Sequence, residues 1–237
     1  MIIRLAVLSV FFLSGCAVNY GDRCLSEVQK IVQQNRLNPH IFQTKKHKIF
    51  ALLSSQKNQD LHVYIEGDGL SWASRTRISL DPTPVTPTGL RLAMADQSSA
   101  TKVYLARPGQ YVEDSGLSFY AWTFSRFSQK IIDSYVDIID QLYELYPQAN
   151  IYLFGYSGGA MIALLVAAER YKAGKKDIQK VVTFAGVLDH EAWSRHHDST
   201  PLNFSLNSMD YLVSLRHIPQ VHYSGDEDGV VPLSITQ

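Results

Sequence analysis

The sequence is poor in cysteine, carries no excess charge of either sign and lacks a long apolar run. Only Cys16 and Cys24 occur among 237 residues, so a disulfide-dense scaffold is excluded. Lys and Arg together number 22, and so do Asp and Glu, so no broad positive field would attract a nucleic acid. No stretch approaches the roughly 20 apolar residues of a membrane-spanning helix. No histidine or cysteine cluster has metal-ligand spacing, and no cofactor is expected.

The first residues have the pattern of a secretory signal. Arg4 precedes an apolar run at 5–13, which is too short to cross a bilayer and suits a signal-peptide core. The run leads into Leu13-Ser14-Gly15-Cys16, which resembles the bacterial lipobox, where cleavage leaves a cysteine that becomes acylated. The alternative is an ordinary secretory signal with an incidental cysteine. We therefore expect residues 1–15 to be a lipoprotein signal peptide and Cys16 to be the lipidation site.

An acylated Cys16 would place the protein in the bacterial envelope, because two or more acyl chains hold a protein stably in a membrane. Ala17 follows the cysteine, and by resemblance to lipoprotein sorting the lack of Asp there favours the outer membrane, facing the periplasm. Only Cys24 would remain as a free thiol, so no disulfide within the chain is expected. Residues 16–48 are expected to form a polar lead-in with a short helix near 25–32, and residues 49–237 the folded domain.

From Ile49 onward, short β-branched apolar runs alternate with longer segments of helical period. The expected strands are 49–53, 61–66, 103–106, 151–154, 181–184 and 221–224. The expected helices are 88–97, 127–146 and one that begins at Gly158 and is ended by Gly174. With 46% hydrophobic residues, the chain can bury one substantial core. The alternation predicts an α/β fold, in which a mostly parallel sheet has helices on both faces.

The segment Gly155-Tyr156-Ser157-Gly158-Gly159 fits the pattern G-x-S-x-G. It lies where an expected strand ends and an expected helix begins, which is the context in which this motif marks a serine nucleophile. The glycines leave room for a sharp turn that lifts the hydroxyl of Ser157 clear of the sheet. The Gly158 amide, at the start of the helix, can then donate a hydrogen bond to an oxyanion. The alternative is a glycine-rich turn with an incidental serine.

A second oxyanion donor is expected from the turn Glu66-Gly67-Asp68-Gly69, which directly follows the expected strand at 61–66. By its position the turn resembles the HG-type oxyanion loop of esterases, with Glu66 in place of the usual histidine. The donating amide would belong to Asp68 or Gly69. The alternative is a tight turn that serves backbone shape alone.

The acid of a catalytic triad is expected at Asp228. In this kind of fold the chain order is Ser, then Asp or Glu, then His. The segment 225–232 resembles the G-x-x-D-x-V-x-P loop that carries the acid in many α/β hydrolases, and its register selects Asp228 over Asp226 and Glu227. Asp189, after an earlier expected strand, is the alternative acid.

No histidine follows Asp228, although a serine nucleophile needs a base to take its proton. One explanation is that the chain is truncated before the strand, the histidine loop and the last helix. A second is that an upstream histidine serves, with His190 as the leading candidate because it follows the expected strand at 181–184. A third is a chain that keeps the fold without turnover and serves in binding or envelope maintenance.

Five segments together resemble a group of bacterial α/β-hydrolase-fold proteins, many of them expected lipoproteins. They are Ile65-Glu66-Gly67-Asp68-Gly69, Leu105-Ala106-Arg107-Pro108-Gly109-Gln110-Tyr111, Ala185-Gly186-Val187-Leu188-Asp189-His190, and residues 79–84 and 155–159. The resemblance spans residues 49–235 and implies an α/β-hydrolase fold with hydrolase activity. It also implies a histidine-bearing segment beyond Gln237. Within it, cysteine is common at the position of Gly109, so a disulfide of such relatives is not expected here. The expected substrate is a small-molecule ester or thioester, or a lipid.

Overall fold

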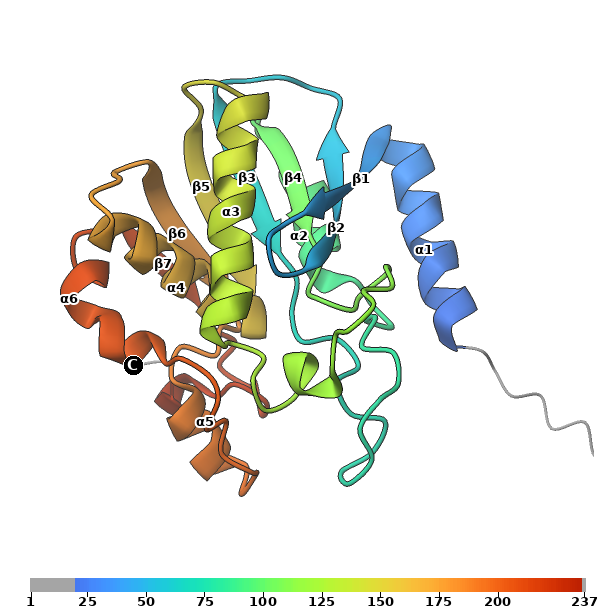
Figure 1. Ribbon diagram of the computed structural model, residues 1–237, viewed down its shortest axis with the longest axis vertical. Helices are drawn as coiled ribbons and strands as arrows, with labels where there is room; N and C mark the ends of the chain where they lie inside the picture. The colour runs from blue at the N-terminus through green and yellow to red at the C-terminus, as the bar shows by residue number, and fades with distance from the viewer. Residues whose placement is uncertain (1–19, 236–237) are drawn as a thin grey trace, which may run out of the picture.

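The computed structural model describes residues 20–235, with side chains from residue 27 onward (Figure 1). The expected signal peptide, the expected lipidation site at Cys16 and the side chain of Cys24 lie outside the described residues. Within the described residues, no helix is long and apolar enough to cross a membrane, and no group of three or more His, Cys, Asp or Glu side chains could hold a metal ion.

A seven-stranded sheet forms the centre of the molecule, in the order β1-β2-β4-β3-β5-β6-β7. The strands are β1 (Leu37–Gln43), β2 (Lys48–Ser54), β3 (Asp60–Ile65), β4 (Thr101–Leu105), β5 (Asn150–Tyr156), β6 (Ile178–Phe184) and β7 (Gln220–Tyr223). Strands β4, β3, β5, β6 and β7 run parallel, whereas β2 is antiparallel to both of its neighbours. The predicted α/β class with a mostly parallel sheet is confirmed.

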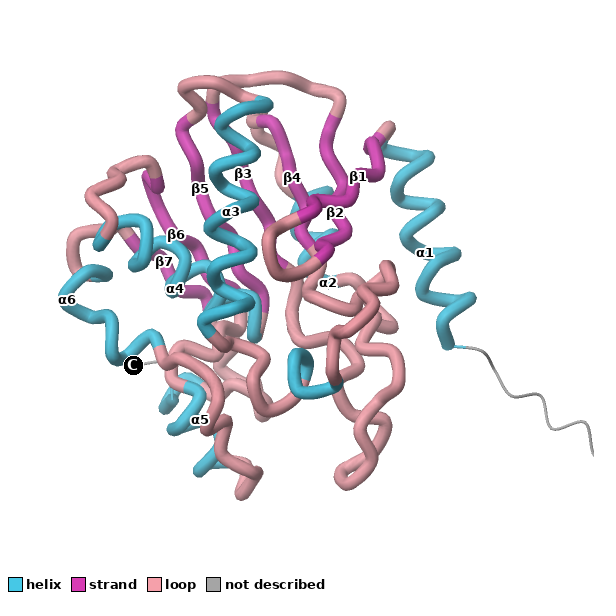
Figure 2. The backbone as a smooth tube through the Cα atoms, in the orientation of Figure 1, coloured by secondary structure: helices cyan, strands magenta, loops and turns pink. Residues whose placement is uncertain are grey.

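Helices cover both faces of this sheet (Figures 1 and 2). The helices are α1 (Tyr20–Asn35), α2 (Thr88–Ala95), α3 (Gln129–Leu145), α4 (Gly158–Lys172), α5 (His190–His196) and α6 (Leu212–Leu215), with short 3-10 turns η1 (Phe119–Trp122), η2 (Ser208–Tyr211) and η3 (Leu233–Ile235). In Figure 1, α3 and α4 lie in front of the sheet and α2 lies behind it. The parallel strands therefore run between two helical layers, as their apolar sequences require.

The alternation of side chains along β4 shows how one strand supplies two cores. Val103 and Leu105 pack into the larger core with α3 and α4, whereas Tyr104 lies in the smaller core with α1 and α2. Successive strand residues point to opposite faces, so a run of apolar residues is buried on both sides. The apolar residues that recur at steps of three and four and predict one face of α3 are buried at Ile131, Tyr135, Ile138 and Leu142, whereas Leu145 in the last turn is 49% exposed.

The sheet extends further towards the N-terminus than the sequence suggests. Strand β1 lies within the stretch 16–48 that was expected to be a lead-in, and it pairs antiparallel with β2 along its whole length. Only Leu37 and Phe42 of this strand are buried, because β1 is an edge strand with few apolar residues. Helix α1 covers residues 20–35 and buries Val28, so it is longer than the short helix expected near 25–32.

Candidate active site

Ser157 occupies a strained turn between β5 and α4. Its backbone has φ +50° and ψ −120°, in a region that residues with a side chain rarely adopt. The Ser157 amide donates to the carbonyl of Phe184 on β6 at 3.0 Å, which holds the turn in place. The turn follows the carboxyl end of a central parallel strand, where open α/β sheets bind their ligands. The structure thus places Ser157 in the context that the sequence predicts.

The glycines around Ser157 are required by close backbone contacts. A Cβ atom on Gly155 would lie 2.4 Å from the Cα of Ala160, and one on Gly159 would lie 2.3 Å from the carbonyl oxygen of Ile65. Both neighbours are backbone atoms and cannot turn away as a side chain could. Strand β3 and helix α4 can therefore approach only where α4 begins with glycine.

Glu66 orders the turn beside Ser157. Its buried carboxylate accepts hydrogen bonds from the Gly67 amide at 2.9 Å, the Gly89 amide at 3.0 Å and the Tyr104 hydroxyl at 3.1 Å. Burial raises the pKa of this carboxyl, while those donors act in the opposite direction. Glu66 therefore joins the turn to α2 and β4.

Three backbone amides near Ser157 remain available to an oxyanion. Since Gly67 donates to Glu66, the donors left in the turn are those of Asp68 and Gly69, and neither has a hydrogen-bond partner within residues 20–235. The amide of Gly158 opens α4 and likewise has no intrahelical partner. Amides at the start of a helix favour negative charge.

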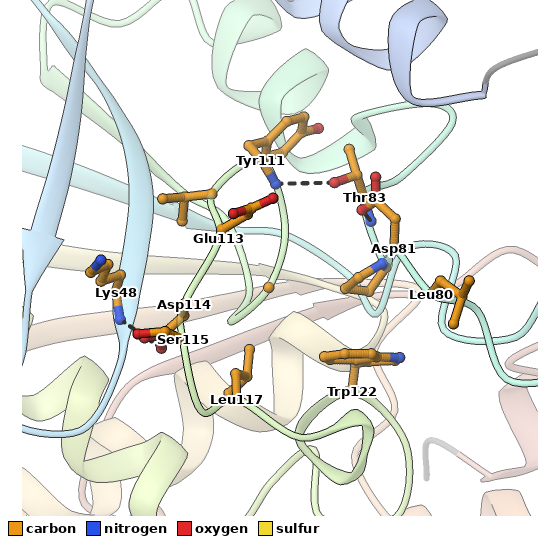
Figure 3. Close-up of a pocket in the computed structure, with 13 residues that line it drawn as sticks. Lys48, Leu80, Asp81, Thr83, Tyr111, Glu113, Asp114, Ser115, Leu117 and Trp122 are labelled. Atoms are coloured by element: carbon orange, nitrogen blue, oxygen red, sulfur yellow. Dashed lines mark hydrogen bonds between the residues drawn. The ribbon is translucent and has the colours of Figure 1, made fainter.

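Ser157, Asp68 and Gly69 face a cavity of about 360 Å³. It is lined by Ser157, the turn 66–70 and the proline-rich loop at Pro84, Val85 and Thr86. A second, larger cavity has a volume of about 640 Å³. Leu80, Thr83 and Trp122 are among the residues that line it (Figure 3), whereas Ser157 is not. The proline-rich loop before α2 therefore shares the smaller cavity with Ser157.

Asp228 is held within its own loop. One carboxylate oxygen accepts from the amides of Val230 at 2.8 Å and Val231 at 2.9 Å. The indole of Trp193 donates to the carbonyl of Val230, which ties this loop to α5. Within residues 20–235, no histidine hydrogen-bonds to Asp228 or to Ser157. The alternative acid, Asp189, instead caps α5 by accepting from amides of its first turn.

His190, the candidate upstream base, is buried against Phe127. Its side chain is 4% exposed, and its ring stacks on Phe127 with centroids 6.1 Å apart, beside the backbone of Ser205. None of its described contacts reaches Ser157. Burial lowers the pKa of His190, because the charged imidazolium loses its hydration.

This lowered pKa makes a testable contribution to the pH dependence of stability. The folded protein binds a proton at His190 less well than the unfolded chain does. The contribution of neutral His190 to stability is therefore present above pH 6.5 and is lost as the pH falls below that value. We expect the free energy of unfolding in urea to decrease from pH 7.5 to 5.5, by at most about 1.4 kcal/mol per pH unit for this proton. His190→Phe keeps the stacking on Phe127 and should reduce the slope; an unchanged slope would contradict this origin.

Comparison with solved structures identifies the architecture. An α/β serine hydrolase homologue from Coxiella burnetii is 14% identical, with 83% of this chain and 77% of that chain covered and a TM-score of 0.53. Est1E from Butyrivibrio proteoclasticus is 12% identical over 84% of this chain and 82% of its own, with a TM-score of 0.57. An α/β serine hydrolase without a lid from Xanthomonas campestris is 11% identical over 84% and 76%, with a TM-score of 0.52.

The chain has the α/β-hydrolase fold. No protein-family model and no curated protein matches its sequence. At these identities the likeness concerns the fold, so the chemistry of this α/β-hydrolase-fold protein rests on its own residues.

One part of the site was not predicted from the sequence. The carboxylate of Asp68 forms ion pairs with Arg107 at 2.8 Å and Arg126 at 3.0 Å, and both guanidinium groups are buried. Arg107 follows the end of β4, as Asp68 follows the end of β3, and that placement at one edge of the sheet was the available signal. Arg126 comes from the loop before α3, where nothing in the sequence points to the site.

Proposed function

We propose that this protein is a serine hydrolase that cleaves carboxylic esters or thioesters through an acyl-enzyme on Ser157. The observation that carries the proposal is the strained turn of Ser157, which opens onto a cavity beside unpaired backbone amides. Such a turn costs about 1–3 kcal/mol and persists where the surrounding structure and function require it. The substrate is a small-molecule ester or a lipid, because the cavity is small and bordered by both apolar and polar side chains.

The chemistry has two steps. The hydroxyl oxygen of Ser157 bonds to the carbonyl carbon as its proton passes to a base, and the carbonyl oxygen becomes an oxyanion held by the amides of Gly158 and of Asp68 or Gly69. Collapse expels the alcohol or thiol, which receives that proton. Water then attacks the acyl group and gives a proton to the base as a second oxyanion forms; collapse of that oxyanion releases the acid, and the base passes the proton from water to the Ser157 oxygen.

The base is the unassigned member of this mechanism. Asp228 orients it in the proposal, from the loop after β7. One candidate is His190, brought to Ser157 by a movement of the chain. The alternative is a protein without turnover that uses the cavity for binding only.

Covalent labelling tests the proposal directly. We expect a fluorophosphonate probe to label the full chain and peptide mass spectrometry to place the adduct on Ser157. Hydrolysis of p-nitrophenyl esters should be lost in proportion to labelling. Absence of both reactions, in a chain shown to be folded, would favour the binding role. Labelling that disappears in His190→Phe would assign the base to His190.

We further propose that acylated Cys16 anchors the protein in the bacterial envelope, facing the periplasm. In support, α1 begins at Tyr20, and its first turn lies towards the end of the molecule where the loops after the parallel strands are found (Figure 1). Three residues separate Cys16 from Tyr20, and these four steps along the chain can span at most about 14 Å, so the anchor would keep the site close to the membrane. We expect Cys16→Ser to move the protein from the membrane to the soluble fraction, whereas Cys24→Ser stays in the membrane. Retention of Cys16→Ser in the membrane would contradict lipidation.

A further inference from the structure

The side chain of Asp68 lies at the start of α4, beside the amides proposed to hold the oxyanion. A Cβ atom on Gly158 would lie 2.2 Å from a carboxylate oxygen of Asp68, so the carboxylate fills the space that a side chain at 158 would need. A negative charge at this position repels an oxyanion that forms on Ser157. An uncompensated Asp68 would therefore oppose the proposed reaction.

Two arginines compensate this charge. Arg107 pairs with one carboxylate oxygen of Asp68 at 2.8 Å, and Arg126 lies 3.0 Å from the other. Arg107 also donates to the backbone carbonyl of Arg126 at 2.6 Å, which fixes the two arginines relative to each other. Both guanidinium groups lie within 6 Å of the Phe127 ring centroid, at 5.3 and 5.6 Å. The cluster is thus held rigidly by packing as well as by charge.

The three side chains carry one negative and two positive charges. Arg107 is 3% exposed and Arg126 is 8% exposed, so little water screens them. The Nε atom of each guanidinium is buried without a hydrogen-bond partner in the described part of the chain. A buried excess charge with unused donors costs stability unless something compensates it, which points to a role outside folding.

We propose that Arg107 and Arg126 are positioning residues that neutralise Asp68 and give the cluster of these three side chains one net positive charge beside the oxyanion formed on Ser157. The inference rests on the proposed hydrolase function and extends it to the charge of the site. The positive charge acts in a partly dry site without reorganising during the reaction, the condition under which fixed charges stabilise a transition state best.

A charge-balance series tests this inference with p-nitrophenyl butyrate as the probe substrate. Arg126→Gln removes the net positive charge, and we expect kcat to fall on the order of 10- to 100-fold while KM changes less than about threefold. Asp68→Asn combined with Arg126→Gln restores one net positive charge through Arg107. We expect this double variant to recover kcat to within about fivefold of the native chain. The rate of fluorophosphonate labelling should follow the same order.

Arg170→Gln is the matched control. Arg170 is also buried between two aspartates, Asp140 and Asp177, but it lies near the other end of α4, about 20 Å from Ser157 along the helix axis. We expect it to lower the melting temperature and leave kcat of the folded protein unchanged. The inference is overturned in favour of a structural role if the double variant has a lower kcat than Arg126→Gln. It is also overturned if Arg126→Gln has the same kcat as the native chain. If the native chain neither labels nor hydrolyses ester, the proposed function fails first and the inference with it.

Discussion

Replacing Ser157 with alanine is expected to abolish covalent labelling and to lower ester hydrolysis by at least about 10³-fold. The hydroxyl is the atom that forms the acyl bond, and the amides around it can stabilise an oxyanion only after that bond begins to form. The backbone of residue 157 keeps its positive φ in the variant, so the strain and the fold are retained. Fluorophosphonate labelling and p-nitrophenyl ester hydrolysis measure the loss, and the melting temperature shows that the variant is folded.

Ser157→Gly separates the role of the hydroxyl from that of the strained backbone. The variant lacks the hydroxyl and should be as inactive as Ser157→Ala. Because glycine adopts φ +50° readily, the variant should also be more stable than Ser157→Ala by about 1 kcal/mol. For a chain of this size that corresponds to a melting temperature higher by roughly 2–4 °C. Catalysis retained in either variant would show that Ser157 is not the nucleophile. A Ser157→Gly variant no more stable than Ser157→Ala would argue against strain at this turn.

Replacing Gly159 with alanine is expected to destabilise the fold by about 3 kcal/mol or more. The added Cβ would lie 2.3 Å from the carbonyl oxygen of Ile65 and 2.6 Å from that of Glu66, so α4 must move away from β3. Such a movement also displaces Ser157 from the turn that carries the second oxyanion donor. We expect the melting temperature to fall by roughly 6–12 °C and esterase activity to fall with it.

Gly229→Ala is the control for that experiment. No heavy atom lies within 4 Å of the position that its Cβ would take, and its φ is not in the left-handed region. The change should therefore alter the free energy of unfolding by less than about 0.5 kcal/mol. A Gly159→Ala variant as stable as Gly229→Ala would mean that β3 and α4 do not approach as closely as the structure shows.

Sequence patterns predict best those elements whose structure depends on residues that are close together in the chain. The runs at 151–154 and 181–184 became β5 and β6, because short, mainly apolar runs with β-branched or aromatic residues favour the strands of a parallel sheet. Helix α3 followed from its apolar spacing, with Leu145 alone displaced to the surface where the helix ends. Strand β1 was not predicted, since at a sheet edge only Leu37 and Phe42 are buried and the alternation is weak.

The candidate site likewise has one part that the sequence predicts and another that depends on tertiary packing. The turn around Ser157 is encoded in five consecutive residues, so its place between strand and helix follows from the sequence alone. The sequence left open which amide of the turn 66–69 is free to bind an oxyanion. That depends on the hydrogen bonds that the amides of Gly67 and the distant Gly89 donate to Glu66. His190 follows β6 as expected, yet its burial against Phe127 is a matter of packing between segments far apart in the chain.

By itself, the sequence determined the α/β class, the mostly parallel sheet and the serine at the strand-to-helix turn, because strand and helix periodicity and glycine spacing act over a few residues. Only the tertiary structure decided that β1 completes the sheet edge and that Asp68 is enclosed by Arg107 and Arg126. Those charges are up to 58 positions apart in the chain (126 − 68), and the Coulomb energy between them depends on distance in space and on burial, neither of which a linear pattern records.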